Sequence, residues 1–307
     1  MSAYVIVATK NRAKETYVLL DYLAAQTLPP TRTYLVGSEP KDIEGLDRHP
    51  LVLAGLAKVL LARPGLTIQR NAGLDAMVAE LPSDAASNPD WFVTFFDDDF
   101  RPATDWLYNA SLAFSQQPGI SGITGAVVAD GIKTEFGIKE EDVVRYLDGS
   151  KAPEPNWSNT GKTRVLEGLY GCNMAYRGLA TVTERFDEHL PMYAWQEDAD
   201  YSSRARRYGD MLLLPACRGV HIGSSSGRVS GLRFGYSQIA NPIFLVRKGT
   251  MTWQRAFTLI SRNIASNVSK TLLFNRIKDF PGRLRGNLQA FFHLLSGKLD
   301  PEHISRM

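Results

Sequence analysis

The sequence predicts an α/β protein with a doubly wound, mostly parallel sheet, and two observations lead to this prediction. Short runs of β-prone residues alternate with stretches of helical periodicity through the first half of the chain, which is the order of a parallel sheet. Polar or acidic residues directly follow several of these strands. Because ligands of open α/β sheets bind beyond the carboxyl ends of the strands, these residues are candidates for a functional site.

The individual elements follow from local periodicity and from helix and strand breakers. The predicted strands are 3–8, 33–36, 66–69, 91–96, 120–129 and 211–214, with two more short strands within 165–177. The predicted helices are 13–25, 51–61, a segment ending near 81, 104–114 and 196–208. Residues 131–162 are polar and contain Pro153 and Pro155, so we expect a surface excursion near the mouth of the site.

The composition is that of a soluble globular protein. The chain has 307 residues, of which 44% are hydrophobic and 22% are charged, which suits one large α/β domain with an appendage. The start of the chain has no signal-peptide pattern, and no uncharged apolar stretch approaches about 18 residues, so we expect a cytoplasmic protein without a transmembrane helix. The two cysteines have no metal-binding spacing and are expected to be buried.

The basic charge is concentrated at the C-terminal end of the chain. Residues 247–307 carry a net charge of +8, whereas the remaining residues carry −5. Apolar residues recur in this segment at three- and four-residue steps, from Trp253 to Leu272 and from Phe280 to Leu295, with arginine and lysine on the other faces. We therefore expect a catalytic domain over residues 1–247 and a basic amphipathic helical extension over residues 248–307.

Two interpretations of the extension stay open. In the first, its apolar faces pack on the core as a helical lid. In the second, they dock on an anionic membrane at the inner face of the plasma membrane, where basic residues and Trp, Phe and Leu are favoured. Nucleic acid is a poorer partner, because basic and aromatic residues are not interleaved in a known binding motif. The sequence does not indicate an oligomeric state.

The most informative motif is Asp97-Asp98-Asp99, which follows the predicted strand 91–96. Three adjacent carboxylates repel one another unless a cation or a set of hydrogen-bond donors offsets their charge. Hard divalent cations take oxygen ligands, and Mg²⁺ is commonly held by one or two carboxylates together with substrate phosphates. The triplet therefore predicts a metal-bridged diphosphate site, against the simpler alternative of a solvated acidic turn that caps the next helix.

Two further clusters suit such a site. Glu197 and Asp198 fall at the start of a predicted helix, where the helix dipole favours acidic residues, and we assign Asp198 the role of general base. His221 follows a strand and precedes a loop rich in serine and glycine that leads to Arg228. A neutral imidazole is a metal ligand, the N–H groups of such a loop suit phosphate, and Arg228 can bind phosphate through two hydrogen bonds.

Together these motifs resemble those of family 2 glycosyltransferases of the GT-A fold. Five segments occur in the order found in that family, over roughly residues 3–247: 8–12, 69–73, 97–102, 171–177, and 195–204 with His221 downstream. Within the family, the run from Trp195 to Tyr201 followed by a histidine is most similar to bacterial galactofuranosyl- and rhamnosyl-transferases.

The resemblance implies a role for each motif. The residues similar to the nucleotide-holding segments are Thr9, Asn11, Arg12, Arg70 and Asn71. Asp97 resembles the acid near the ribose and diphosphate, and the implied ligands of Mn²⁺ or Mg²⁺ are Asp97, Asp99 and His221. Asp198 resembles the base, and the implied sugar and acceptor pocket contains Asn173, Trp195 and Glu197. One departure concerns the aspartate that usually ends the second strand. Here either Glu39 substitutes for it or the nucleotide base is recognised differently.

The implied activity is metal-dependent, inverting transfer of a hexosyl or deoxyhexosyl group from a nucleotide-diphosphate sugar to a hydroxyl of a glycan or lipid-linked glycan, in bacterial polysaccharide and cell-envelope synthesis. One alternative is a nucleotidyltransferase on a related fold, but residues 9–12 lack the glycines of its phosphate loop. The other is a non-catalytic scaffold that binds glycans or membranes. The chain keeps all four candidate catalytic and metal-binding residues, Asp97, Asp99, Asp198 and His221, which argues against a scaffold that has lost its activity.

Overall fold

The computed structural model describes residues 1–82, 90–134, 136–224, 230–275 and 277–307. The chain divides into two compact units, which are described separately. Unit 1 consists of Met1–Pro64, Ile68–Arg185 and Arg204–Gly227. Unit 2 consists of Gly65–Thr67, Phe186–Ser203 and Arg228–Met307.

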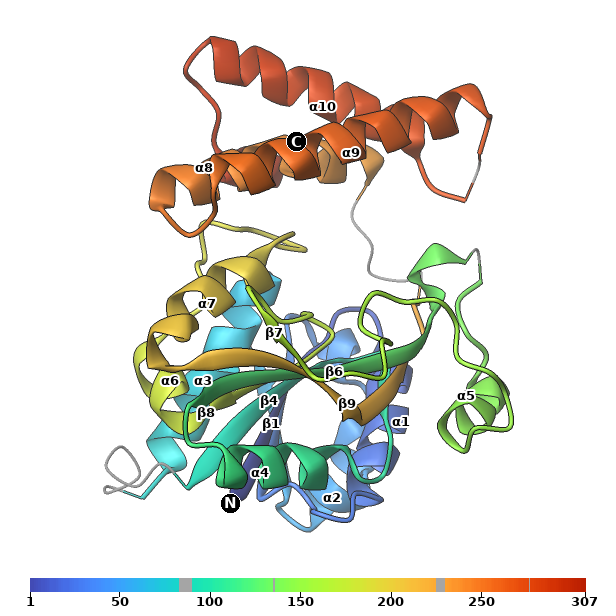
Figure 1. The fold of residues 1–307 in the computed structure, drawn as a ribbon, viewed down its shortest axis with the longest axis vertical. Helices are drawn as coiled ribbons and strands as arrows, with labels where there is room; N and C mark the ends of the chain where they lie inside the picture. The colour runs from blue at the N-terminus through green and yellow to red at the C-terminus, as the bar shows by residue number, and fades with distance from the viewer. Residues whose placement is uncertain (83–89, 135, 225–229, 276) are drawn as a thin grey trace. The chain divides into compact units, whose positions relative to one another are not determined.

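Unit 1 contains a mixed sheet whose strand order is β3-β2-β1-β4-β8-β6-β9-β5, with β7 paired to β9 (Figure 1). The strands are β1 (Ser2–Ala8), β2 (Arg32–Gly37), β3 (Ala57–Leu61), β4 (Trp91–Asp97), β5 (Phe100–Pro102), β6 (Ile120–Asp130), β7 (Arg164–Leu166), β8 (Asn173–Arg177) and β9 (Asp210–His221). The first four strands are parallel, and so are β6 and β9. Strands β5, β7 and β8 run antiparallel to their neighbours.

Helices cover both faces of this sheet, as a doubly wound fold requires. The helices within unit 1 are α1 (Ala13–Ala24), α2 (Pro50–Leu53), α4 (Trp106–Gln116), α5 (Glu140–Leu147) and α6 (Gly178–Thr183), while α3 (Leu66–Glu80) and α7 (Glu197–Ala205) have residues in both units. Helices α1 and α4 share a buried apolar core with Val5 and Val7 of β1. Ile6 points to the opposite face, where Gly73 of α3 approaches it so closely that a Cβ atom would lie 2.6 Å from its Cγ2 atom. The predicted α/β class is confirmed.

Two predicted elements between β2 and β4 are wrong. The segment 51–61 is not one helix, because helix α2 ends at Leu53 and β3 begins at Ala57. Gly55 adopts a φ of +72° between them, a left-handed conformation that interrupts a helix. The segment 66–69 is the first turn of α3 rather than a strand. Short apolar runs are ambiguous in periodicity, and here pairing of β3 with β2 decides between the alternatives.

Unit 2 contains three long helices, α8 (Gly231–Lys248), α9 (Trp253–Leu272) and α10 (Phe280–Leu295), followed by a 3₁₀ helix over Pro301–Arg306. Glycines bring α8 and α10 into close contact. A Cβ atom at Gly235 would lie 2.1 Å from the Arg283 carbonyl oxygen, and one at Gly286 would lie 2.1 Å from that of Leu232. Among the described residues, no helix is long and apolar enough to span a membrane.

The predicted boundary between residues 247 and 248 falls at the C-terminal end of α8, a helix that the periodicity of the tail did not predict. Unit 2 includes this helix together with two earlier segments. The division into a catalytic domain over 1–247 and an extension over 248–307 stays a prediction.

Candidate active site

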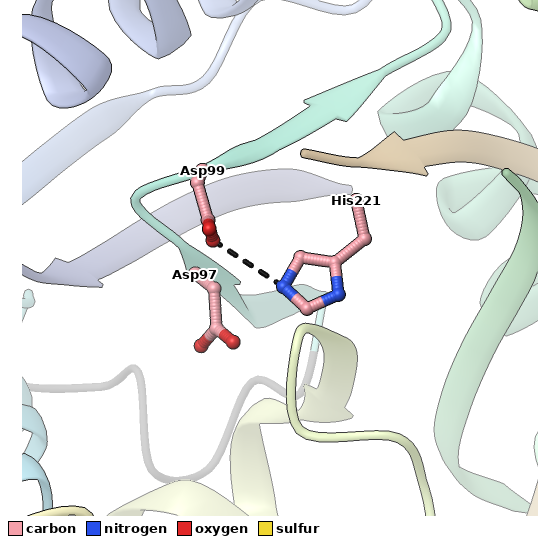
Figure 2. A group of neighbouring side chains, drawn as sticks. All are labelled: Asp97, Asp99 and His221. Carbon is pink, nitrogen blue, oxygen red and sulfur yellow. Dashed lines mark ion pairs between the residues drawn. The ribbon is translucent and has the colours of Figure 1, made fainter. Parts of the chain in front are cut away.

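The sheet of unit 1 brings Asp97, Asp99 and His221 together. Asp97 is the last residue of β4, a sharp turn contains Asp98 and Asp99, and His221 ends β9. Each of the three side chains offers one ligand atom, and these atoms all lie within 4.8 Å of one another. Figure 2 shows the imidazole of His221 pointing toward Asp99, with the carboxylate of Asp97 beside them. We call this group the acidic triad.

Asp99 has the geometry of a cation ligand. Its Oδ2 atom accepts a hydrogen bond of 2.8 Å from the backbone N–H of Ser224 and lies 3.3 Å from Nη1 of Arg12. Its Oδ1 atom is buried, and the donor that it faces is Nε2 of His221, 3.3 Å away, a long contact that leaves it without a hydrogen bond of normal geometry among the described residues. The charge of a buried carboxylate must be offset, either by a proton on His221 or by a divalent cation in its place. Two carboxylates and one imidazole are a donor set that fits a divalent cation such as Mn²⁺.

His221 is oriented by Asp130, a residue that the sequence analysis missed. The Nδ1 atom of His221 lies 3.0 Å from Oδ1 of Asp130, while Oδ2 of Asp130 accepts a hydrogen bond of 2.9 Å from the hydroxyl of Tyr170. When the Nδ1–H group of His221 donates a hydrogen bond to Asp130, Nε2 faces Asp99. Metal-binding histidines are usually oriented in this way, by a carboxylate on the other ring nitrogen. The sequence signal was present, because Asp130 directly follows the predicted strand 120–129, just as Asp97 directly follows the predicted strand 91–96.

The charges around the triad shift its pKa values. Burial lowers the pKa of His221, but the neighbouring carboxylates of Asp99 and Asp130 outweigh burial and raise it well above its usual value. Burial likewise raises the pKa of Asp99, but His221, Arg12 and the Ser224 N–H outweigh it, so the net shift is downward. A proton on His221 thus supplies positive charge where a metal cation would supply it.

Two arginines bind carboxylates of the Asp97–Asp99 triplet. Arg12 binds Asp98 at 2.8 Å, so the middle carboxylate of the triplet is directed at an arginine rather than into the triad. Burial raises the pKa of Asp98 to about 7, against the opposing effect of Arg12. The buried side chain of Arg70 donates to Asp97 at 3.0 Å and to the Gly171 carbonyl at 2.9 Å. Burial also raises the pKa of Asp97, although Arg70 and His221 oppose the shift.

The loop after β1 is held by a second buried carboxylate, Asp42. Its two oxygens accept hydrogen bonds from the backbone N–H groups of Asn11, Ser38 and Glu39. Burial raises its pKa, but these donors outweigh burial and lower it. Glu39 itself is half-exposed and pairs with Lys10 and Lys41. Asp42, in the 3₁₀ helix Pro40–Ile43 that follows β2, therefore shapes this loop, and a role of Glu39 in binding the nucleotide base stays a prediction.

Two more residues of unit 1, Thr9 and Asn71, are predicted to bind the nucleotide. Thr9 is buried, and its carbonyl accepts a hydrogen bond of 2.9 Å from the side chain of Gln69, which also bonds the Val36 carbonyl. Asn71 is buried in the second turn of α3. Arg228 lies outside the described residues.

Asn173, predicted to line the sugar pocket, binds the neighbouring strand. Its side chain is fully buried, and its Oδ1 atom accepts hydrogen bonds from the Gly125 N–H at 2.6 Å and from the Thr124 hydroxyl at 3.2 Å. These bonds tie β8 to β6. A role of Asn173 in the sugar pocket stays a prediction.

The predicted base and two pocket residues belong to unit 2. Asp198 lies in the first turn of α7 and is partly exposed, and Glu197 beside it is buried. The Trp195 carbonyl accepts a hydrogen bond from Asn241, and the Trp195 ring lies edge to face with Phe234. Asp200 binds Lys248 at 2.9 Å and the Thr250 hydroxyl at 2.8 Å, which agrees with a structural function for this carboxylate.

Comparisons with known proteins show similarity in structure. No protein-family model matches the chain, and no curated protein sequence matches it. TarS 1–349 from S. aureus is 16% identical and has a TM-score of 0.51, and TarS 1–349 in complex with UDP is 18% identical with the same TM-score. The alignments cover 78% and 79% of this chain and only 64% and 65% of the TarS chains. The mannosyltransferase PcManGT from Pyrobaculum calidifontis, in complex with GDP-Man and Mn²⁺, is 12% identical, has a TM-score of 0.53, and is matched over 98% of this chain and 84% of its own.

At these identities the comparisons concern the fold alone. The alternation of strands and helices, the mixed sheet and the similarity to PcManGT agree with one another. The chain therefore has a Rossmann-like α/β fold of the GT-A type, similar to the folds of TarS 1–349 and PcManGT.

Proposed function

We propose that this protein is a metal-dependent glycosyltransferase that uses a nucleotide-diphosphate sugar as donor. The observation that carries the proposal is the acidic triad at the carboxyl ends of β4 and β9, with the buried Oδ1 atom of Asp99 facing Nε2 of His221. The fold supports it, since PcManGT was solved with GDP-Man and Mn²⁺, and TarS was solved with UDP. A cation held by Asp97, Asp99 and His221 would act as a Lewis acid toward the diphosphate.

The chain's own residues supply the other parts of the reaction. The triad and Arg12 concentrate charge where the diphosphate must bind, and the loop over residues 9–12 lies at the same strand ends. Asp198 accepts the proton of the acceptor hydroxyl as its oxygen attacks the anomeric carbon from the face opposite the diphosphate. The new C–O bond forms as the bond to the diphosphate oxygen breaks, so the configuration inverts. The role of Asp198 rests on its motif.

The motif around Asp198 also supports a narrower proposal. Its similarity to bacterial galactofuranosyl- and rhamnosyl-transferases supports transfer of a hexosyl or deoxyhexosyl group. The acceptor would then be a hydroxyl of a glycan or lipid-linked glycan in polysaccharide and cell-envelope synthesis. Such an acceptor places the enzyme at the cytoplasmic face of the plasma membrane.

A donor assay tests the proposed activity. Thermal-shift screening of UDP-, GDP- and dTDP-sugars with Mn²⁺ identifies the donor, and release of the free nucleotide is then measured with Mn²⁺, with Mg²⁺ and with EDTA. We expect hydrolysis or transfer that EDTA abolishes. A nucleotidyltransferase would instead release pyrophosphate from a nucleoside triphosphate and a sugar phosphate. A scaffold would bind glycans without releasing nucleotide, and hydrolysis that continues in EDTA would contradict the metal site.

We also propose that unit 2 docks on an anionic membrane. From α9 onward, its exposed large apolar residues among those described are Trp253, Phe257, Val268, Leu272, Leu273, Phe274, Ile277, Leu288, Phe291, Phe292 and Leu295. Leu272, Leu273 and Phe274 at the end of α9 are the clearest case, with exposures of 71%, 77% and 85%. Residues 268–278 contain three basic residues and no acidic one. Exposed apolar side chains among basic ones are typical of interfacial membrane segments.

The membrane proposal predicts that replacing Leu272, Leu273 and Phe274 together by serine weakens binding to vesicles about tenfold or more, because three apolar side chains no longer enter the bilayer. Co-sedimentation with vesicles of phosphatidylglycerol and phosphatidylcholine measures the effect. The full chain is used, since α8 packs against α10 and truncation would expose that contact. Leu53→Ser, at a residue of unit 1 that is 74% exposed, is the matched control. Equal binding by both variants would contradict the proposal.

A further inference from the structure

The excursion between β6 and β7 is fastened beside the acidic triad by hydrogen bonds to β6. The Glu154 N–H donates to the Val128 carbonyl at 2.8 Å, and the Val127 N–H donates to the Ser158 hydroxyl at 3.0 Å. The Asn156 amide donates to Oδ2 of Asp130 at 3.3 Å. Residues 154–158 therefore run along the end of β6, where Asp130 contacts His221.

These bonds hold Trp157 in one place. Its two neighbours in the chain, Asn156 and Ser158, are bonded to each other. The side-chain Oδ1 atom of Asn156 accepts hydrogen bonds from the backbone N–H and the hydroxyl of Ser158. Ser158 is fully buried, whereas Trp157 between the two anchors keeps 48% of its surface exposed. A large aromatic side chain that is exposed, and whose neighbours in the chain are anchored on both sides, is suited to contact a ligand.

Trp157 is connected to the triad through Tyr170. The two rings lie 5.5 Å apart between centroids, and the Tyr170 ring lies 6.5 Å from that of His221 in an edge-to-face arrangement. The Tyr170 hydroxyl donates to the same Asp130 carboxylate that holds His221. One buried carboxylate thus contacts both the proposed metal ligand His221 and the aromatic pair of Tyr170 and Trp157.

We propose that Trp157 and Tyr170 form the apolar wall against which the sugar ring of the donor packs. This assignment rests on the proposed glycosyl transfer. The sugar of the donor is bonded directly to the diphosphate. A diphosphate bound at the triad therefore places the sugar ring close to His221. The C–H face of a sugar is apolar and matches an indole surface, while Asp130 acts as a positioning residue for both parts of the site.

Binding measurements with Trp157→Ala test the assignment. Calorimetric titrations with Mn²⁺ compare UDP with UDP-GlcNAc, GDP with GDP-mannose and dTDP with dTDP-rhamnose, so that the sugar contribution is the difference within the pair that the wild-type protein binds. We expect Trp157→Ala to weaken the nucleotide sugar about tenfold, which corresponds to about 1.4 kcal/mol, and to leave the free nucleotide unchanged. Trp157→Phe is expected to retain most of the sugar contribution, because an aromatic face remains.

Tyr108→Ala, at an aromatic residue of α4 that is 52% exposed, controls for the loss of an exposed ring. Unchanged affinity of Trp157→Ala for the nucleotide sugar would overturn the assignment. So would equal losses for nucleotide and nucleotide sugar, since these would show an effect on the nucleotide site or on the fold. A wild-type protein that binds neither nucleotide nor nucleotide sugar would contradict the proposed function itself, and this assignment with it.

Discussion

Replacing Asp99 by asparagine is expected to abolish Mn²⁺ binding and to lower glycosyl transfer by about 10³-fold. The asparagine side chain has no charge, and its amide brings N–H donors to a place where Asp99 now presents a buried oxygen to Nε2 of His221. A Lewis acid contributes several kcal/mol to such a reaction, and each 1.36 kcal/mol is about a factor of ten in rate. Manganese paramagnetic resonance measures binding, and steady-state rates measure transfer.

Asp98→Asn is the matched control for this prediction. The Asp98 carboxylate binds Arg12, and burial raises its pKa to about 7, so a neutral amide at this position is a milder change than at Asp99. We expect Asp98→Asn to keep Mn²⁺ binding and to lower the melting temperature. Intact Mn²⁺ binding in Asp99→Asn would contradict the metal site. Equal loss of Mn²⁺ binding in both variants would contradict the division of the triplet.

Replacing Asp198 by asparagine is expected to lower transfer to the acceptor by about 10²- to 10⁴-fold, the contribution of a positioned general base. The asparagine amide has nearly the same shape but cannot accept the proton of the acceptor hydroxyl at neutral pH. Binding of the nucleotide sugar and of Mn²⁺ should not change, because the acidic triad is untouched. Transfer rates at saturating donor, together with donor affinity from calorimetry, separate the two effects.

Asp200→Asn, two residues further along α7, distinguishes chemistry from stability. Asp200 binds Lys248 and the Thr250 hydroxyl, so its replacement should lower the melting temperature while transfer per folded molecule is kept. If Asp198→Asn transferred sugar at the wild-type rate, the base would have to be another residue. If Asp198→Asn lost donor affinity as well, Asp198 would act in binding rather than in proton transfer.

Local sequence predicted the elements whose patterns are unambiguous. The strand that ends in Asp97 is a continuous apolar run buried on both faces, which is typical of an inner parallel strand. Helix α1 has a clear apolar stripe and begins at Ala13 as predicted. The prediction is wrong for the segment 51–61, expected as one helix, and for 66–69, expected as a strand. In both segments the apolar pattern does not separate a strand from a helix.

The sheet topology was beyond local prediction. Strand β8 enters antiparallel between β4 and β6, and no pattern within residues 173–177 reveals this direction. The same strand explains why Asn173 is buried, since its amide joins β8 to β6. Long-range pairing decides both features.

The sequence by itself determined the chemistry of the candidate site, because carboxylates and an imidazole placed after strands can serve few purposes, and the strand ends of an α/β sheet share one edge. Only the tertiary structure decided which residues meet. The register pairs Asp130 with His221 across β6 and β9, and Phe100 with His221 across β5 and β9, which brings Asp99 and the imidazole together. Register is a property of two strands distant in sequence, so neither strand alone encodes that Asp130 orients the histidine that faces Asp99.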